Sequence, residues 1–190
     1  YLLRHVHTHE DGDFSEGALR CAHDAELANG LGNLLSRTIG LIERRRGGAI
    51  PAPGAAEPAD GRLLDVARTL EVDVEAAISD FRLDEALARV WELVDEANRY
   101  VAATAPWRSG PDESGGGPGR VGTVLYNLAE SLRLIAVSLT PFLPATAAAI
   151  LRQLGLPEHV PPGPSALQWG QTPPGTRIRR EAPLFPKPPR

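Results

Sequence analysis

Three polar side chains of one predicted helix stand in a column that could contact the edge of a base. Asn29, Asn33 and Arg37 follow one another at intervals of four residues, which places them on adjacent turns of an α-helix. An amide offers a donor and an acceptor, and a guanidinium offers donors only, so together they can read the polar edge of an unpaired base. The alternative interpretation is an ordinary solvated helix face, where polar residues also gather.

The residues around this column predict a long amphipathic helix over residues 24–46, with Asp24 as its N-cap after a break at His23. One side of it faces a core and lies well over about 90° from the polar column. That side comprises Leu27, Leu31, Leu34, Leu35, Thr38, Leu41 and Ile42. The basic run 44–46 before Gly47 suits a helix C-terminus, where cations oppose the negative end of the helix dipole. Contact with nucleic-acid phosphates is the other interpretation of this run.

Composition limits the class of protein. With 190 residues, 42% of them hydrophobic, and few aromatic residues, the chain predicts one mainly α-helical domain. Cys21 is the single cysteine, which excludes an internal disulfide, and no zinc-binding pattern occurs, so we expect no metal site and a cytoplasmic setting. No apolar run approaches the roughly 20 residues that span a bilayer, and no signal-peptide layout is present, so we expect no membrane contact. A formal charge of −4 argues against indiscriminate binding of DNA or RNA, so any nucleic-acid contact must be local.

Apolar periodicity predicts the remaining elements of a bundle of five to six helices. We expect helices over residues 15–22, 62–80, 83–104, 121–139 and 144–154, with Ser15 capping the first. The apolar start at residues 1–6 predicts a truncated strand. In the helix over residues 62–80, the predicted core positions are Leu63, Val66, Leu70, Val74 and Ile78.

The segments after the third long helix differ in composition. Trp107 follows Pro106 at a helix exit, where its indole can stack on a base or pack as a partly buried core aromatic. Residues 108–120 form a Gly-, Ser- and Pro-rich run without an apolar residue. This composition predicts a mobile surface loop. The proline-dense tail predicts an extended segment, anchored by Trp169, Leu184 and Phe185.

Five runs in the same order resemble the C-terminal half of bacterial methionyl-tRNA synthetases, and the resemblance covers nearly the whole chain. The runs are DGDFSEGAL (residues 11–19), LANGLGNLLSRTIGLIE (27–43), ANRYVAATAPW (97–107), VGTVLYNLAESLRLIAVSLTPFLPATAAAILRQLGL (121–156) and LFP (184–186). The resemblance implies an all-α helical bundle at residues 15–154 that binds the anticodon arm. It further implies that residues 1–14 end a stem-contact segment, and that residues 155–190 pack as a tail on the bundle or a catalytic domain.

The resemblance also assigns site residues and partners. It implies that Asn33, Arg37 and Trp107 meet the CAU anticodon of methionine tRNA, with Asn29 as a secondary candidate that helix packing or a cap explains equally well. The partners implied are the methionine tRNA anticodon stem-loop and the catalytic domain of the same class I synthetase.

No catalytic residue is predicted in this chain, because neither an HIGH-like nor a KMSKS-like motif occurs in it. We therefore expect the chain alone to be non-catalytic and to need no cofactor, since ATP and methionine would bind the catalytic domain of the ligase. Two alternatives remain open at this point. One is a free-standing synthetase paralogue that binds tRNA or a protein without ligase activity, and the other is a helical interaction domain that has lost RNA binding.

Overall fold

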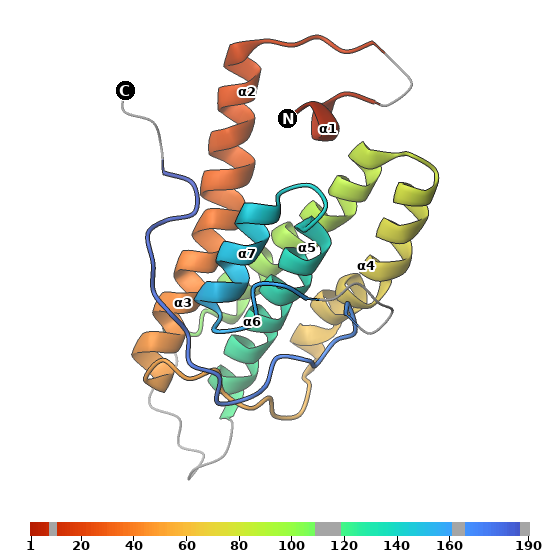
Figure 1. Cartoon of the computed structure of the whole chain (residues 1–190). Helices are drawn as coiled ribbons and strands as arrows, with labels where there is room; N and C mark the ends of the chain where they lie inside the picture. Colours follow the sequence, from red (N-terminus) through yellow and green to blue (C-terminus); the bar gives the residue numbers. More distant parts are fainter. Residues whose placement is uncertain (8–10, 109–118, 161–165, 187–190) are drawn as a thin grey trace.

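The structure, a computed structural model, describes residues 1–7, 11–108, 119–160 and 166–186 and shows a helical bundle (Figure 1). Its helical elements are α1 (Leu2–His5), α2 (Glu16–Ala22), η1 (His23–Gly32), α3 (Asn33–Arg46), η2 (Pro58–Asp60), α4 (Gly61–Ser79), α5 (Leu83–Thr104), α6 (Gly119–Leu139) and α7 (Pro144–Gln153). The described residues form no β-strand, which confirms the predicted all-α class. The predicted mobile loop lies mostly at residues 109–118, outside the described residues.

The polar column belongs to a long rod in which α2, η1 and α3 run on without interruption (Figure 1). The rod begins at Ser15, whose hydroxyl accepts a hydrogen bond from the Ala18 N–H at 3.0 Å, as predicted. The predicted break with Asp24 as a new cap is wrong, because η1 is a π-helical segment that continues the hydrogen-bonded backbone. The Asp24 carboxylate instead lies 3.2 Å from the ring of His23. The rod ends at Gly47, whose φ of 57° gives the left-handed cap expected there.

The four helices α4 to α7 complete the bundle, and their bounds differ from the predicted ones by no more than two residues. Helix α5 has the predicted bounds. One predicted core position is wrong, because Ile78 is 37% exposed while Ala77 is buried in its place. The core side of α4 therefore passes through Val74 and Ala77 in its last turns.

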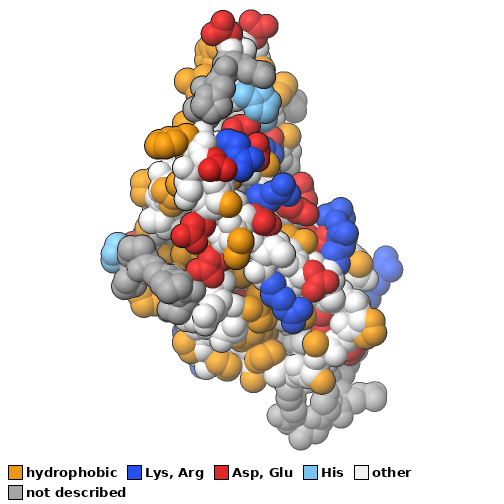
Figure 2. Space-filling view, turned by 90° about the vertical axis from the view of Figure 1, so that its right-hand side faces the viewer, with side chains coloured by type: hydrophobic (Ala, Val, Ile, Leu, Met, Phe, Trp, Pro, Cys, Tyr) orange, Lys and Arg blue, Asp and Glu red, His pale blue; other side chains and the backbone are white. Residues whose placement is uncertain are grey.

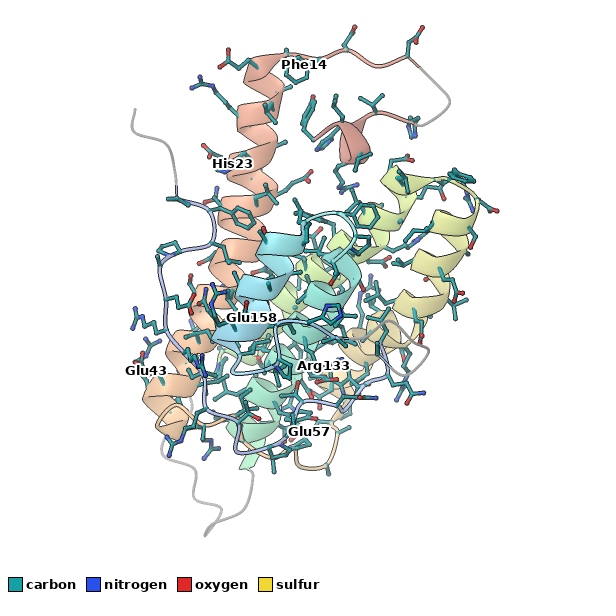
Figure 3. The ribbon with its side chains drawn as sticks, viewed as in Figure 1. Phe14, His23, Glu43, Glu57, Arg133 and Glu158 are labelled. Carbon is teal, nitrogen blue, oxygen red and sulfur yellow. The ribbon has the colours of Figure 1, made fainter. Side chains whose placement is uncertain are left out.

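The first residues form α1, a single helical turn, and not the truncated strand predicted from their apolar character. The Arg4 and His5 N–H groups both donate to the Tyr1 carbonyl at 3.0 Å, so these backbone groups are satisfied locally. A cavity of about 500 Å³, lined mainly by apolar side chains, lies between α1, α2 and α5. Phe14 lies at the rim of this cavity and is 60% exposed. It lies just before the N-terminal end of α2 (Figure 3).

Residues 166–186 of the tail form no helix or strand and run along the bundle as an extended segment (Figure 1). Trp169, Leu184 and Phe185 are half-buried and pack against the hydrophobic core, which confirms the three predicted anchors. Phe185 approaches the long rod at Gly32, where its ring lies 3.4 Å from the place a Cβ would occupy. A larger residue at this position would therefore press on both the tail and the π segment.

A buried ion pair on α6 fixes residues 166–172 of the tail, and the sequence did not predict it. The Glu130 carboxylate is fully buried and accepts the backbone N–H groups of residues 170–172 at 2.8–3.1 Å. Arg133 donates to Glu130 at 2.6 Å and to the carbonyls of Ala166 and Gln168, each also at 2.6 Å. In Figure 3, Arg133 lies in the middle of the bundle, where α6 faces the tail. Burial by itself raises the pKa of Glu130, but the hydrogen bonds and charge of Arg133 outweigh it and the pKa lies below its ordinary value.

Acid should weaken the fold through this carboxylate. Because the folded pKa of Glu130 is lowered, its contribution to stability is complete above the unfolded pKa of about 4 and is lost as pH falls through the folded pKa. We expect the melting temperatures of the parent protein and of Glu130→Gln to differ most near neutral pH and to converge toward pH 3. Thermal unfolding from pH 7 to pH 3 measures this, with the exposed Glu75→Gln as control. A difference in melting temperature between the parent protein and Glu130→Gln that stays constant with pH would contradict the lowered pKa of Glu130.

Candidate functional site

The structure places the predicted site residues at the surface of the long rod and at the exit of α5. Asn33, the first residue of α3, is exposed, and Arg37 one turn later is half-buried. Asn29 is exposed as well, but it belongs to the π segment η1. The wider turn of a π-helix changes the alignment of residues four apart, so the α-helical spacing assumed for the column holds for Asn33 and Arg37 alone.

Arg37 and Trp107, which are far apart in the sequence, lie together. The guanidinium carbon of Arg37 stands 5.2 Å from the centre of the Trp107 ring, within the range of a cation–π contact. Trp107 is 43% exposed and belongs to the exposed large hydrophobic side chains, which does not favour the alternative of a partly buried core aromatic. An exposed indole beside a guanidinium and a nearby helix face with an exposed amide can accept a flat, unpaired base.

Local backbone geometry sets the position of Trp107. Helix α5 ends at Thr104 and is capped by Ala105, whose φ of 41° is left-handed and turns the chain away from the helix axis. The Arg108 N–H donates to the Ala105 carbonyl at 2.8 Å and closes a tight turn, with the buried Pro106 as its second residue. Trp107 is the third residue of this turn. The backbone therefore sets the direction in which its side chain leaves the chain, independently of any side-chain contact.

Sequence reasoning missed one residue of this site, Arg45. Its Nη2 donates to the Trp107 carbonyl oxygen at 2.8 Å. The predicted alternatives for the basic run were helix capping and phosphate contact, and neither includes this bond. The sequence held no signal for it, since the two residues are 62 positions apart.

A buried polar cluster ties the end of α5 to the start of α6. The fully buried Asp60 carboxylate accepts the Tyr100 hydroxyl at 2.6 Å and the Nη1 of Arg120 at 2.8 Å. Asn127 donates to the Tyr100 oxygen at 3.1 Å. Burial raises the pKa of Asp60, but the hydrogen bonds from Arg120, the Glu57 N–H and Tyr100 outweigh it, so the pKa lies below its ordinary value. The members of this cluster pair with one another, and the Arg120 Nη2 also lies 2.7 Å from the Asp60 carboxylate, as in a structural network rather than an open acid–base site.

Charge on the surface agrees with a local rather than a general nucleic-acid contact. On the face shown in Figure 2, acidic and basic side chains are interspersed.

Among the described residues, no group of three or more His, Cys, Asp or Glu side chains could hold a metal ion. Within the same residues, no helix is long and apolar enough to cross a bilayer.

Comparison with known proteins gives relatives over almost the whole chain. The methionine–tRNA ligase of Caldanaerobacter subterraneus is 43% identical over 187 residues, which are 98% of this chain and 29% of that protein. The methionine–tRNA ligase of Deinococcus radiodurans is 40% identical over 191 residues, which are 98% of this chain and 27% of that protein. The crystal structure of apo methionyl-tRNA synthetase from Mycobacterium tuberculosis superimposes with a TM-score of 0.86 at 31% identity, covering 99% of this chain and 38% of that one. No family model matches the chain.

These relatives are aminoacyl-tRNA ligases, and the helical bundle is a part of that class of protein. More particularly, the chain belongs to the methionyl-tRNA synthetase family and corresponds to its C-terminal part. It spans less than a third of the length of the curated relatives it matches.

Proposed function

We propose that this chain binds the anticodon arm of methionine tRNA as the C-terminal part of a methionine–tRNA ligase that works in the cytoplasm. The single observation that carries the proposal is the exposed Trp107 indole with the Arg37 guanidinium 5.2 Å from its centre. The relatives are methionine–tRNA ligases, which supports methionine tRNA as the partner.

Each side chain has a distinct role in this proposal. Trp107 stacks on an unpaired anticodon base, and Arg37 covers part of the ring while its N–H groups can donate at the rim to a base carbonyl or a phosphate. Asn33 supplies both a donor and an acceptor from the exposed start of α3. Asn29 remains a secondary candidate, because the π segment shifts it from the Asn33 and Arg37 column.

The first base of a CAU anticodon accounts for the preference we propose. Cytosine presents an exocyclic amino donor beside acceptors, and an amide can satisfy one of each. Uridine at the same position has a carbonyl in place of that amino group, which leaves a polar group mispaired. A mispaired polar group in a partly desolvated site costs more than a weakened hydrogen bond, so the contact selects as well as binds.

The remaining parts of the ligase would supply the chemistry. We propose that ATP and methionine bind a catalytic domain in the longer protein and that this chain adds no cofactor. The apolar cavity between α1, α2 and α5, with the exposed Phe14 at its rim, is the surface we assign to that domain. Residues 1–14 would then form the end of the stem-contact segment.

Replacing Trp107 by alanine should weaken binding of a CAU anticodon hairpin by about 1–3 kcal/mol, the usual value of one base–aromatic stack. Titration of a labelled hairpin into the chain measures this. The matched control is Phe81→Ala, another exposed aromatic (71%), which precedes α5 whereas Trp107 follows it, about 33 Å away along that helix. Equal affinities of the parent chain for CAU and UAU hairpins would refute anticodon recognition, and a neutral Trp107→Ala would remove the indole from the interface.

A further inference from the structure

Helix α3 holds Trp107 at two points. The Arg37 guanidinium lies over the indole, at 5.2 Å from its centre, and the Arg45 Nη2 donates to the Trp107 carbonyl at 2.8 Å. The two arginines are eight residues apart, which corresponds to about 12 Å along the helix axis. One rigid element therefore contacts both the ring and the backbone of the same tryptophan.

We infer that Arg45 is a positioning residue, which fixes the orientation of the Trp107 indole for stacking; this inference rests on the proposed function. A hydrogen bond from a charged donor is stronger than one between neutral groups, so it restrains the peptide group between Trp107 and Arg108. Because the peptide plane and the side chain share the Trp107 Cα, restraining the carbonyl limits the directions in which the indole can point.

Restraint of this kind favours binding of a flexible, single-stranded partner. An indole that is already oriented loses less conformational freedom when a base stacks on it, so more of the stacking energy appears as affinity. The turn at Ala105 and Pro106 directs the chain toward α3, and Arg45 on α3 then binds the Trp107 carbonyl at the end of this turn. The hydrogen bond from Arg45 to the Trp107 carbonyl therefore adds to the restraint that the turn at the end of α5 imposes.

The neighbouring Arg44 provides a matched control. It lies at the same basic end of α3, so its removal takes away the same charge and the same interaction with the helix dipole. Its guanidinium lies along its own helix, with Nη1 3.2 Å from the place a Cβ on Gly40 would occupy. A difference between Arg45→Ala and Arg44→Ala therefore does not arise from lost charge at the end of α3, and the Trp107 signal shows whether it acts through the indole.

The test compares Arg45→Ala, Arg44→Ala and Arg45→Lys in the full chain, by titration with the CAU hairpin and by 19F NMR of incorporated 5-fluorotryptophan. The resonance of Trp107 among the three tryptophans is assigned by its loss in Trp107→Phe. We expect Arg45→Ala to bind the hairpin about threefold to tenfold more weakly than Arg44→Ala, the range that corresponds to the net contribution of one hydrogen bond. The Trp107 resonance should shift in Arg45→Ala and not in Arg44→Ala, and Arg45→Lys, which keeps a charged donor, should recover part of both effects.

Two results would overturn the inference. One is an Arg45→Ala variant that matches Arg44→Ala in hairpin affinity, whether or not the Trp107 resonance shifts. The other is an unshifted resonance despite weaker binding, which would show that Arg45 acts without orienting the indole. If Arg45→Ala does not fold, the same two criteria apply to Arg45→Lys measured against Arg44→Lys. Equal affinities of the parent chain for CAU and UAU hairpins would show that the anticodon proposal itself fails, whereas a costly Trp107→Ala with equal arginine variants removes the role of Arg45 alone.

Discussion

Replacing Arg133 by alanine is expected to lower the free energy of unfolding by about 3–5 kcal/mol, because it leaves a buried carboxylate without its counterion. Glu130 is fully buried, and Arg133 holds it through three hydrogen bonds of 2.6–3.1 Å. The same substitution removes the donors to the carbonyls of Ala166 and Gln168, so this part of the tail also loses two hydrogen bonds to α6. Urea unfolding followed by circular dichroism measures the effect.

The matched control is Arg152→Ala. Arg152 also joins a helix to the tail, through the Glu181 carboxylate at 2.9 Å, but this pair is exposed to solvent. Exposed pairs contribute little, so we expect a much smaller loss of stability. Adding Glu130→Gln to Arg133→Ala should recover part of the loss, because a buried amide costs less than a buried unpaired charge. Equal losses for Arg133→Ala and Arg152→Ala would show that burial does not strengthen the inner ion pair.

The second large effect is expected at Asp60, whose replacement by alanine should cost about 2–4 kcal/mol. Asp60 accepts hydrogen bonds from the Tyr100 hydroxyl, the Arg120 guanidinium and the Glu57 N–H. Alanine leaves the charge of Arg120 and the hydroxyl of Tyr100 without this partner in a mostly buried site. Because Tyr100 and Arg120 lie near the end of α5 and the start of α6, these two helix ends, of which that of α5 precedes Trp107, should loosen as well.

Thermal and urea unfolding of Asp60→Ala test this, with Asp65→Ala as the control. Asp65 is exposed on α4 and pairs with Arg68 within the same helix, so its loss should leave stability close to that of the parent protein. Hydrogen exchange of the last turn of α5 would show the local loosening. Unchanged exchange there, together with a small loss of stability, would mean that the cluster around Asp60 does not hold the two helix ends.

Local periodicity predicted most of the helices correctly. The apolar repeat of α5 and the proline at the start of α7 are contained in short stretches of sequence, so their bounds could be derived without tertiary information. The errors arose where local signals were ambiguous. An apolar start of a few residues suits a strand as well as the single turn of α1, and Asp24 suits a cap as well as the interior of a π segment.

The candidate site was predicted in part. The exposed amide of Asn33, the guanidinium of Arg37 and the indole of Trp107 were identified from the sequence and the family resemblance, and their roles in binding remain predictions. Their arrangement depends on contacts that no local pattern encodes. The Arg45 bond to the Trp107 carbonyl joins residues 62 positions apart, and the bonds from Arg133 to the tail span 33 and 35 positions.

The sequence by itself determined the helical class, most core positions of the helices over residues 24–46 and 62–80, and the residue types available for a base contact, because side-chain chemistry and periodicity act over a few residues. The tertiary structure alone decided that α3 meets the exit of α5, that Arg37 covers the indole and that a buried ion pair holds the tail. The physical reason is that burial and distant contacts depend on how whole helices pack. From the sequence alone, a charged residue such as Glu130 is therefore expected at the surface, and its burial is recognised only when its neighbours in space are known.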